Sequence, residues 1–273
     1  MNIAVKLGSI KELELLLHYH GHIKIFELPA KLIKEKSLIG KLMSYGYIFN
    51  VHGITMYSAD MANLLIDKTQ HYLQLCNELG CYNFILHGLV IKDSIYSSNN
   101  SALIDMTLRT LDTIKDYAVK FGISCFLENG CYSKSLSAQV YEIPSDPYCH
   151  LKLAQTLQMG IVLDLGHAAL SARWYGQKLD DFLLPYIQAS HLPDIIHLSD
   201  NFLENDEHLA IGEGRADLES FRQAIALWPE SLLTVENFPD EIHKSLSWLV
   251  ECLNNGYTKS DIDELCRCTG WKF

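Results

Sequence analysis

Short apolar runs alternate along this chain with longer stretches in which apolar residues recur at helical spacing. Each run is rich in β-branched or aromatic residues and has the length of a fully buried strand. The predicted strands are Ile3–Leu7, Ile23–Leu28, Tyr47–His52, Asn83–His87, Ser124–Glu128, Gly160–Asp164, Ile195–Leu198 and Leu232–Glu236. Helical spacing is clearest in Met61–Leu79, Ala102–Phe121, Leu218–Leu227 and His243–Leu253.

This alternation of strand and helix implies parallel strands joined by right-handed crossovers. Eight such units in 273 residues predict an α/β fold, a single (β/α)8 TIM barrel with its active site at the C-terminal ends of the strands. An open, doubly wound sheet is the alternative. We expect residues 1–273 to form one domain, with 254–273 as a C-terminal cap and Tyr141–Tyr148 as a local loop.

Six of the predicted strands end in a side chain that can bind a metal, namely His52, His87, Glu128, Asp164, His197 and Glu236. A single such residue is often a structural hydrogen-bonding group or a helix cap. Together, however, ionisable groups cost free energy unless they are paired or bind a metal. Because the ends of barrel strands converge, the series predicts a metal site at the barrel mouth.

Three further candidates enlarge this ligand set. His167 follows Asp164 by one helical turn, and Asp206 and His208 lie in the loop after the seventh predicted strand. Imidazole and carboxylate ligands without thiolates suit zinc, manganese, iron or magnesium. The nine candidates exceed the roughly four to six ligands that one ion needs, so we expect one to three divalent ions as cofactors.

Composition and charge narrow the expected partners. The chain is 48% apolar, which allows a large core, and its net charge of -11 disfavours a broad nucleic-acid surface. No apolar run is long enough to span a membrane, and the N-terminal stretch does not read as a signal peptide. The eight cysteines are expected to be free thiols in a reducing compartment, so we expect a cytoplasmic protein without a membrane partner.

The strand-end residues lie in three longer motifs. They are Leu-Glu128-Asn, Leu-Asp164-Leu-Gly-His167-Ala, and His197-Leu-Ser-Asp-Asn followed by Asp206-Glu-His208-Leu-Ala-Ile-Gly212-Glu-Gly214. With these motifs the chain resembles, over nearly its whole length, the xylose-isomerase-like TIM barrels, the superfamily of sugar phosphate isomerases, epimerases and endonuclease IV. The motifs are specific for the superfamily but not for one reaction.

The resemblance implies two competing chemistries. In the isomerase and epimerase branch, positions matching Glu128, Asp164, His197 and Glu236 bind one divalent ion, and Glu128 and Glu236 act as catalytic residues that move a proton next to a carbonyl. In the endonuclease IV branch, all nine matching positions bind zinc ions that cleave DNA at an abasic site. A metal-binding barrel without catalytic activity is a third hypothesis.

Weaker features favour the isomerase branch. Glu27, at the end of the second strand, and Asp217, beyond Gly214, are similar to acidic positions of that branch, although an exposed strand end and a helix N-cap are the structural alternatives. No Arg or Lys lies between His197 and His208, which departs from some ketose epimerases.

The predicted function is therefore a metal-dependent sugar or sugar-phosphate isomerase or epimerase, with an endonuclease IV-like phosphodiesterase as the alternative. Residues expected to contact the substrate are Glu27, Arg173, Trp174 and Arg215. A guanidinium beside aromatic rings suits a sugar or a phosphate, although Arg173 and Trp174 also fit an amphipathic helix. The expected partner is a small carbohydrate-type molecule, ahead of nucleic acid, and the sequence is compatible with a homo-oligomer.

Overall fold

Eight parallel strands form a closed barrel in the order β1-β11-β10-β9-β6-β4-β3-β2, so the predicted (β/α)8 TIM barrel is confirmed. The structure is a computed structural model that describes residues 2–54, 62–135, 138–189, 192–237, 241–253 and 258–269. The barrel strands are β1 (Ile3–Lys6), β2 (Ile25–Pro29), β3 (Ile48–His52), β4 (Asn83–Leu86), β6 (Ser124–Glu128), β9 (Gly160–Asp164), β10 (Ile195–Leu198) and β11 (Leu232–Val235). Each overlaps a strand predicted from the sequence.

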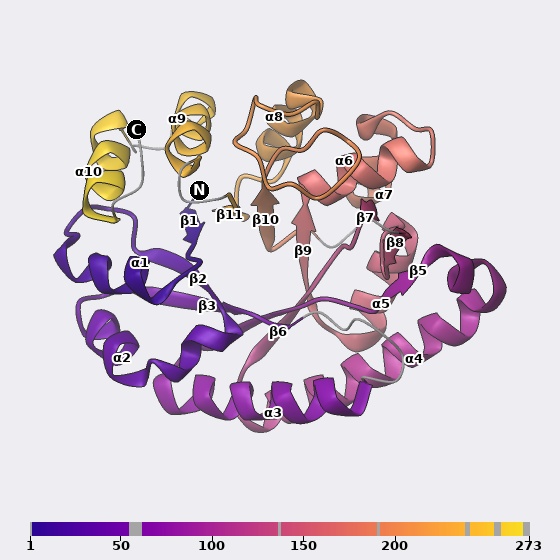
Figure 1. The fold of residues 1–273 in the computed structure, drawn as a ribbon, viewed down its shortest axis with the longest axis horizontal. Helices are drawn as coiled ribbons and strands as arrows, with labels where there is room; N and C mark the ends of the chain where they lie inside the picture. Colours follow the sequence, from indigo (N-terminus) through magenta and orange to yellow (C-terminus); the bar gives the residue numbers. More distant parts are fainter. Residues whose placement is uncertain are drawn as a thin grey trace.

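Helices surround the barrel, with α3 and α4 along its lower edge in Figure 1. The helices are α1 (Ile10–Leu15), α2 (Lys36–Ser44), α3 (Ala62–Leu79), α4 (Asp93–Lys120), α5 (Pro147–Leu157), α6 (Leu165–Trp174), α7 (Leu179–Gln188), α8 (Leu218–Leu227), α9 (Ile242–Cys252) and α10 (Lys259–Thr269), with short 3-10 helices η1 (Leu16–His18) and η2 (Ala30–Lys34). Within the described residues, no helix is both long and apolar enough to cross a membrane.

A second, three-stranded antiparallel sheet was not predicted. It has the order β5-β8-β7 and consists of β5 (Val90–Lys92), β8 (Ala138–Glu142) and β7 (Tyr132–Ser135). The predicted loop Tyr141–Tyr148 is therefore wrong at both ends, because Tyr141 and Glu142 belong to β8 and Pro147 begins α5. Asp146 caps that helix by accepting a hydrogen bond from the backbone N–H of Cys149.

Helix α10 packs against α9 and α1, close to β1 in Figure 1. It is the described part of the predicted cap 254–273, of which residues 254–257 and 270–273 lie outside the described residues. The predicted helix Met61–Leu79 is described from Ala62 onward. All eight cysteines are free, as expected from the sequence.

Candidate metal centre

The candidate ligands lie directly above an apolar layer inside the barrel. This layer consists of Ile85, Phe126, Val162, Ile195 and Leu232. Side chains two residues apart on a strand share a face. Two positions beyond four of these residues, on or just past the same strands, come His87, Glu128, Asp164 and His197. The strand period therefore stacks a polar ligand layer on an apolar layer that excludes water from below.

Four side chains from neighbouring strands form the centre of the site. Glu128, Asp164, His197 and Glu236 each present an atom, and these atoms all lie within 4.8 Å of one another. Nδ1 of His197 lies 2.8 Å from Oε2 of Glu236 and 3.3 Å from Oε1 of Glu128. All four side chains are buried, with at most 5% of their surface exposed. The four predicted ligands are thus close enough to bind one ion together.

A second group adjoins this centre and shares Glu128 with it. Nε2 of His52 and Nε2 of His87 lie 3.2 and 3.4 Å from Oε2 of Glu128. On its other side, Nδ1 of His87 donates a hydrogen bond of 2.9 Å to Oε1 of Glu142 on β8. Because a carboxylate only accepts, a hydrogen lies on Nδ1. In the neutral form of the ring, the lone pair of Nε2 would then point into the site.

The remaining three candidates, His167, Asp206 and His208, form a third group. Nδ1 of His167 donates to the carbonyl of Asn129 at 2.8 Å, and Nδ1 of His208 donates to the carbonyl of Glu236 at 2.9 Å. Their Nε2 atoms face the same oxygen, Oδ2 of Asp206, at 3.2 and 3.0 Å. Neutral rings would therefore direct two lone pairs at an acceptor, so either two protons or one shared cation stabilises this group.

Ionisation in the site is strongly coupled. Burial disfavours the charged form of Glu27, but the neighbouring His197 lowers the pKa of Glu27 to about 2. Burial also disfavours protonated His197, yet Glu27 and Glu128 raise its pKa to about 10. Burial, with Lys6 nearby, lowers the pKa of His52 to about 4, so this imidazole is neutral near pH 7, as a metal ligand must be.

The unpaired atoms of the central group fit a divalent ion. Burial raises the pKa of Asp164, and His167 opposes this shift only in part. Oδ2 of Asp164 is buried without a hydrogen-bond partner, as are Oε2 of Glu128, Nδ1 of His197 and Oε2 of Glu236. Buried polar atoms without partners cost free energy, and a cation among them would remove that cost. A donor set of three carboxylates and one imidazole suits zinc, manganese, iron or magnesium.

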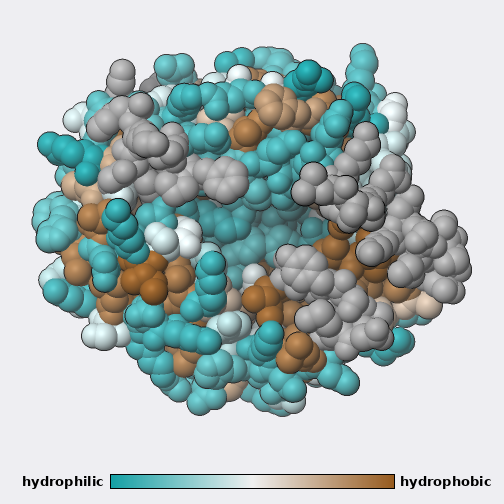
Figure 2. Space-filling model, in the orientation of Figure 1, coloured by the Kyte–Doolittle hydropathy of each residue, from teal (hydrophilic) through white to brown (hydrophobic). Residues whose placement is uncertain are grey.

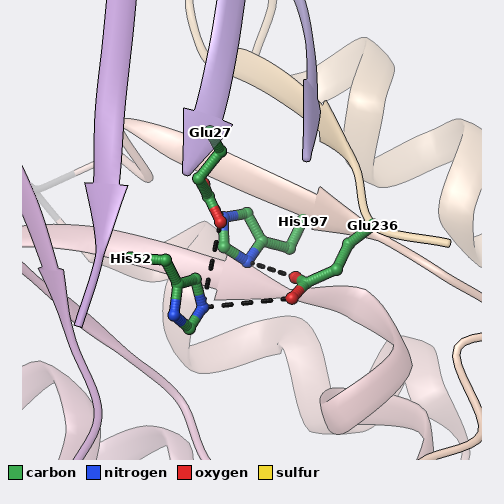
Figure 3. Close-up of side chains that lie close together, drawn as sticks. All are labelled: Glu27, His52, His197 and Glu236. Carbon is green, nitrogen blue, oxygen red and sulfur yellow. Dashed lines mark hydrogen bonds and ion pairs between the residues drawn. The ribbon is translucent and has the colours of Figure 1, made fainter. Parts of the chain in front are cut away.

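The structure places Glu27 inside the site. This side chain is fully buried and is not an exposed strand end. Its carboxylate points toward His197 and His52, and Figure 3 shows both rings together with Glu236. Asp217, in contrast, is the N-cap of α8, where it accepts hydrogen bonds from the backbone of Glu219 and Ser220. Of the two acidic residues that resemble the isomerase branch, only Glu27 thus adjoins the ligands.

The other predicted substrate-contacting residues lie outside these ligand groups. Arg173 and Arg215 line a cavity of about 350 Å³ together with Lys178. Trp174 stacks on Tyr132 of β7, with ring centroids 4.1 Å apart and planes within 8° of parallel. A larger cavity of about 820 Å³ lies at the N-terminal ends of β6 and β9, opposite the ligands. Figure 2 shows a central hollow lined mainly by hydrophilic residues.

Several residues that shape the site were missed by the sequence argument. Lys6, at the end of β1, is ion-paired with Glu236. Asn129 exchanges two hydrogen bonds with the backbone of Asp164, at 2.7 and 3.0 Å, and so fixes the end of β9. Lys6 is the last residue of β1 and the last but one of the predicted strand Ile3–Leu7. The same strand-end criterion, extended to cations, would therefore have found it.

The loop that carries Asp206 and His208 is organised by Asp200, which also follows a strand. Its carboxylate accepts hydrogen bonds from the backbone N–H groups of Asn201, Gly212, Gly214 and Ala216. A side chain at Gly214 would place its Cβ 2.2 Å from Oδ1 of Asp200, so only glycine fits there. This close backbone approach accounts for the glycine at position 214.

The chain belongs to the family of xylose isomerase-like TIM barrels, whose pattern matches residues 31–252. Two uncharacterised proteins of Methanocaldococcus jannaschii are similar in sequence, at 22% identity over 66% of this chain and 27% over 59%. The matched stretches span 66% and 52% of those relatives. The predicted membership of this superfamily is therefore confirmed.

Solved structures of the same fold include three with informative descriptions. A D-tagatose 3-epimerase-like protein matches with a TM-score of 0.71, 19% identity and coverage of 92% of this chain and 97% of that one. A protein from Thermus thermophilus, soaked with ZnCl2, matches with a TM-score of 0.68 and 16% identity, and the match covers 94% of this chain and 100% of that one. The 3-keto-D-glucoside 4-epimerase of E. coli matches with a TM-score of 0.66 and 15% identity, and the match covers 92% of this chain and 100% of that one. At these identities the likeness establishes the fold.

Proposed function

We propose that this protein is a divalent-metal-dependent isomerase or epimerase that acts on a carbohydrate-type substrate. The observation that carries the proposal is the position of Glu128 and Glu236, which approach Nδ1 of His197 from β6 and β11, on either side of β9 and β10. Two carboxylates that face each other across a shared metal position can exchange protons with opposite faces of one carbon. The epimerases among its structural neighbours support this proposal by analogy.

Each group of the central cluster has a defined role in this reaction. A bound divalent ion would polarise the substrate carbonyl and lower the pKa of the adjacent C–H group. Asp164 and His197 would hold the ion, and Glu128 and Glu236 would each contribute an oxygen. One glutamate, ionised, accepts the proton from the carbon next to the carbonyl. For epimerisation the other, protonated, donates a proton to the opposite face, so that one proton leaves and one returns.

The proposal is tested by assaying a panel of ketoses and sugar phosphates with added Mn²⁺ or Zn²⁺. Glu128→Gln and Glu236→Gln should each lower kcat by at least about 100-fold, because each removes one acid–base group. Glu219→Gln, the same change on the exposed surface of α8, is the matched control and should retain full activity. Turnover that survives the change at Glu128 would remove its catalytic role.

The second candidate is an endonuclease IV-like phosphodiesterase with more than one ion. The third ligand group favours it, because His167 and His208 direct their Nε2 atoms at Asp206 in an arrangement that a further cation would stabilise. The assay above should include a duplex with an abasic site. Cleavage of that duplex without turnover of any sugar would overturn the isomerase proposal. Metal uptake without either activity would favour a non-catalytic metal-binding barrel.

A further inference from the structure

Lys6, at the end of β1, and Glu27, in the middle of β2, lie side by side, because the strand register pairs them directly. Nζ of Lys6 is ion-paired with Oε1 of Glu236 and lies 3.8 Å from Oε1 of Glu27. The Lys6 side chain is 21% exposed and that of Glu27 is fully buried. The central ligand group includes neither residue. Burial of a carboxylate and an ammonium costs free energy, so their position beside four candidate ligands indicates a function for both.

Glu27 determines which nitrogen of His197 faces the central ligands. Nε2 of His197 lies 3.0 Å from Oε2 of Glu27, in a hydrogen bond that the carboxylate can only accept. The ring hydrogen that points to Glu27 is therefore on Nε2. In the neutral ring, Nδ1 then carries the lone pair, and it is this atom that faces Glu128 and Glu236. A carboxylate behind a metal-binding histidine fixes the ring orientation and strengthens the ligand.

Lys6 makes the two oxygens of Glu236 unequal. Oε1 is held in the ion pair with Lys6, whereas Oε2 is buried, lacks a hydrogen-bond partner and lies 2.8 Å from Nδ1 of His197. With Oε1 engaged, only Oε2 is available to an ion bound between Glu236, His197 and Glu128. The second lone pair of Oε1 is left for the proton exchange of the proposed function. The ammonium also supplies a positive charge beside Glu27 and so limits the cost of burying that carboxylate.

We propose that Lys6 and Glu27 are positioning residues: Glu27 presents Nδ1 of His197 to the metal, and Lys6 restricts Glu236 to binding through one oxygen. This inference rests on the metal site of the proposed function but concerns residues outside the central ligand group. It assigns β1 and β2 to the support of ligands on β10 and β11, across the closure of the barrel.

The test uses Co²⁺ as the probe. Calorimetric titration measures its affinity, and the visible d–d absorption of the loaded protein reports its coordination. Glu27→Gln should weaken Co²⁺ binding about 10- to 100-fold, because the amide keeps the size of the carboxylate but loses its charge. Lys6→Met should free Oε1 of Glu236, raise the coordination number and weaken the d–d bands. Lys6→Arg should restore the wild-type spectrum, and Lys178→Met, at an exposed lysine, is the matched control.

Each outcome separates this inference from the proposed function. Wild-type protein that binds no Co²⁺ would refute the metal-dependent function itself. Wild-type protein that binds Co²⁺, with an unchanged spectrum in Lys6→Met and an affinity within twofold of wild type in Glu27→Gln, would refute only the positioning roles. Should Lys6→Met not fold, as judged by circular dichroism, Lys6→Gln provides a polar uncharged replacement with the same expected spectrum.

Discussion

Replacing Asp200 by asparagine should loosen the loop that carries two candidate ligands. The side chain is 1% exposed, and each of its oxygens accepts two backbone hydrogen bonds. Oδ1 accepts from Asn201 and Ala216 at 2.8 and 3.1 Å, and Oδ2 accepts from Gly212 and Gly214 at 3.0 Å. An amide has one oxygen, so either orientation of the new side chain turns an NH₂ group toward two N–H donors.

The magnitude follows from the two lost bonds. Hydrogen bonds to a charged acceptor contribute about 1.5–3 kcal/mol each, so the free energy of unfolding should fall by at least about 3 kcal/mol. Urea unfolding followed by circular dichroism measures this change, and limited proteolysis should show faster cleavage between residues 200 and 217. The reason is that the loop loses two of the four hydrogen bonds that tie its backbone to residue 200.

Asp217→Asn is the matched control, because it makes the same change in the same loop. Asp217 is exposed and caps α8, and asparagine is as good an N-cap as aspartate. The expected loss is below about 0.5 kcal/mol. If the Asp200 and Asp217 variants unfolded at equal urea concentrations with equal slopes, Asp200 would not hold the loop as the hydrogen bonds indicate.

Three further outcomes are expected. Burial lowers the pKa of His150 to about 4, so the native state resists a proton that the unfolded state accepts below about pH 6.5. The free energy of unfolding should therefore fall by about 2 kcal/mol from pH 7 to pH 5. His150→Gln, measured by urea unfolding, should remove this part of the pH dependence. Equal pH slopes would contradict it. Added Mn²⁺ or Zn²⁺ should raise the free energy of unfolding by about 2.7 kcal/mol when the free metal concentration is 100 times the dissociation constant, and a chelator should reverse the gain. An unfolding midpoint that does not depend on metal would argue against the site. Gly88→Ala would place its Cβ 1.6 Å from the carbonyl oxygen of Ile143 and should lower the free energy of unfolding by more than about 2 kcal/mol. Gly40→Ala, on α2, is the control and should leave the stability unchanged or raise it. Similar melting temperatures of the two variants would refute the contact.

The barrel was predictable because parallel strands buried on both faces are nearly continuous apolar runs. Ser124–Glu128, Gly160–Asp164 and Ile195–Leu198 were predicted with the bounds that the structure has. The sheet β5-β8-β7 was not, since β5 has three residues and β7, with the sequence YSKS, lacks an apolar pattern. Short antiparallel strands are stabilised by tertiary contacts that leave little periodicity in the sequence.

The candidate ligands were predictable because they share one position, the end of a strand. Glu142 was not, because it comes from the unpredicted β8 and reaches His87 from 55 residues away in the sequence. Arg173 and Arg215 have residue types that suit a substrate, but they line a cavity separate from the ligand groups. Their contact with a substrate therefore stays a prediction, because it depends on where a helix and a loop end.

The pairing of β1 with β11 closes the barrel and brings Lys6 to the site. Lys6 and Glu236 are 230 positions apart in the chain, yet they form one ion pair across the seam between the first and the last barrel strand. During synthesis, β11 leaves the ribosome after every other barrel strand, so a nascent chain carries most ligands but holds no complete centre. Metal binding at the proposed centre would therefore report completed barrel closure, and it would separate finished molecules from truncated or misassembled ones.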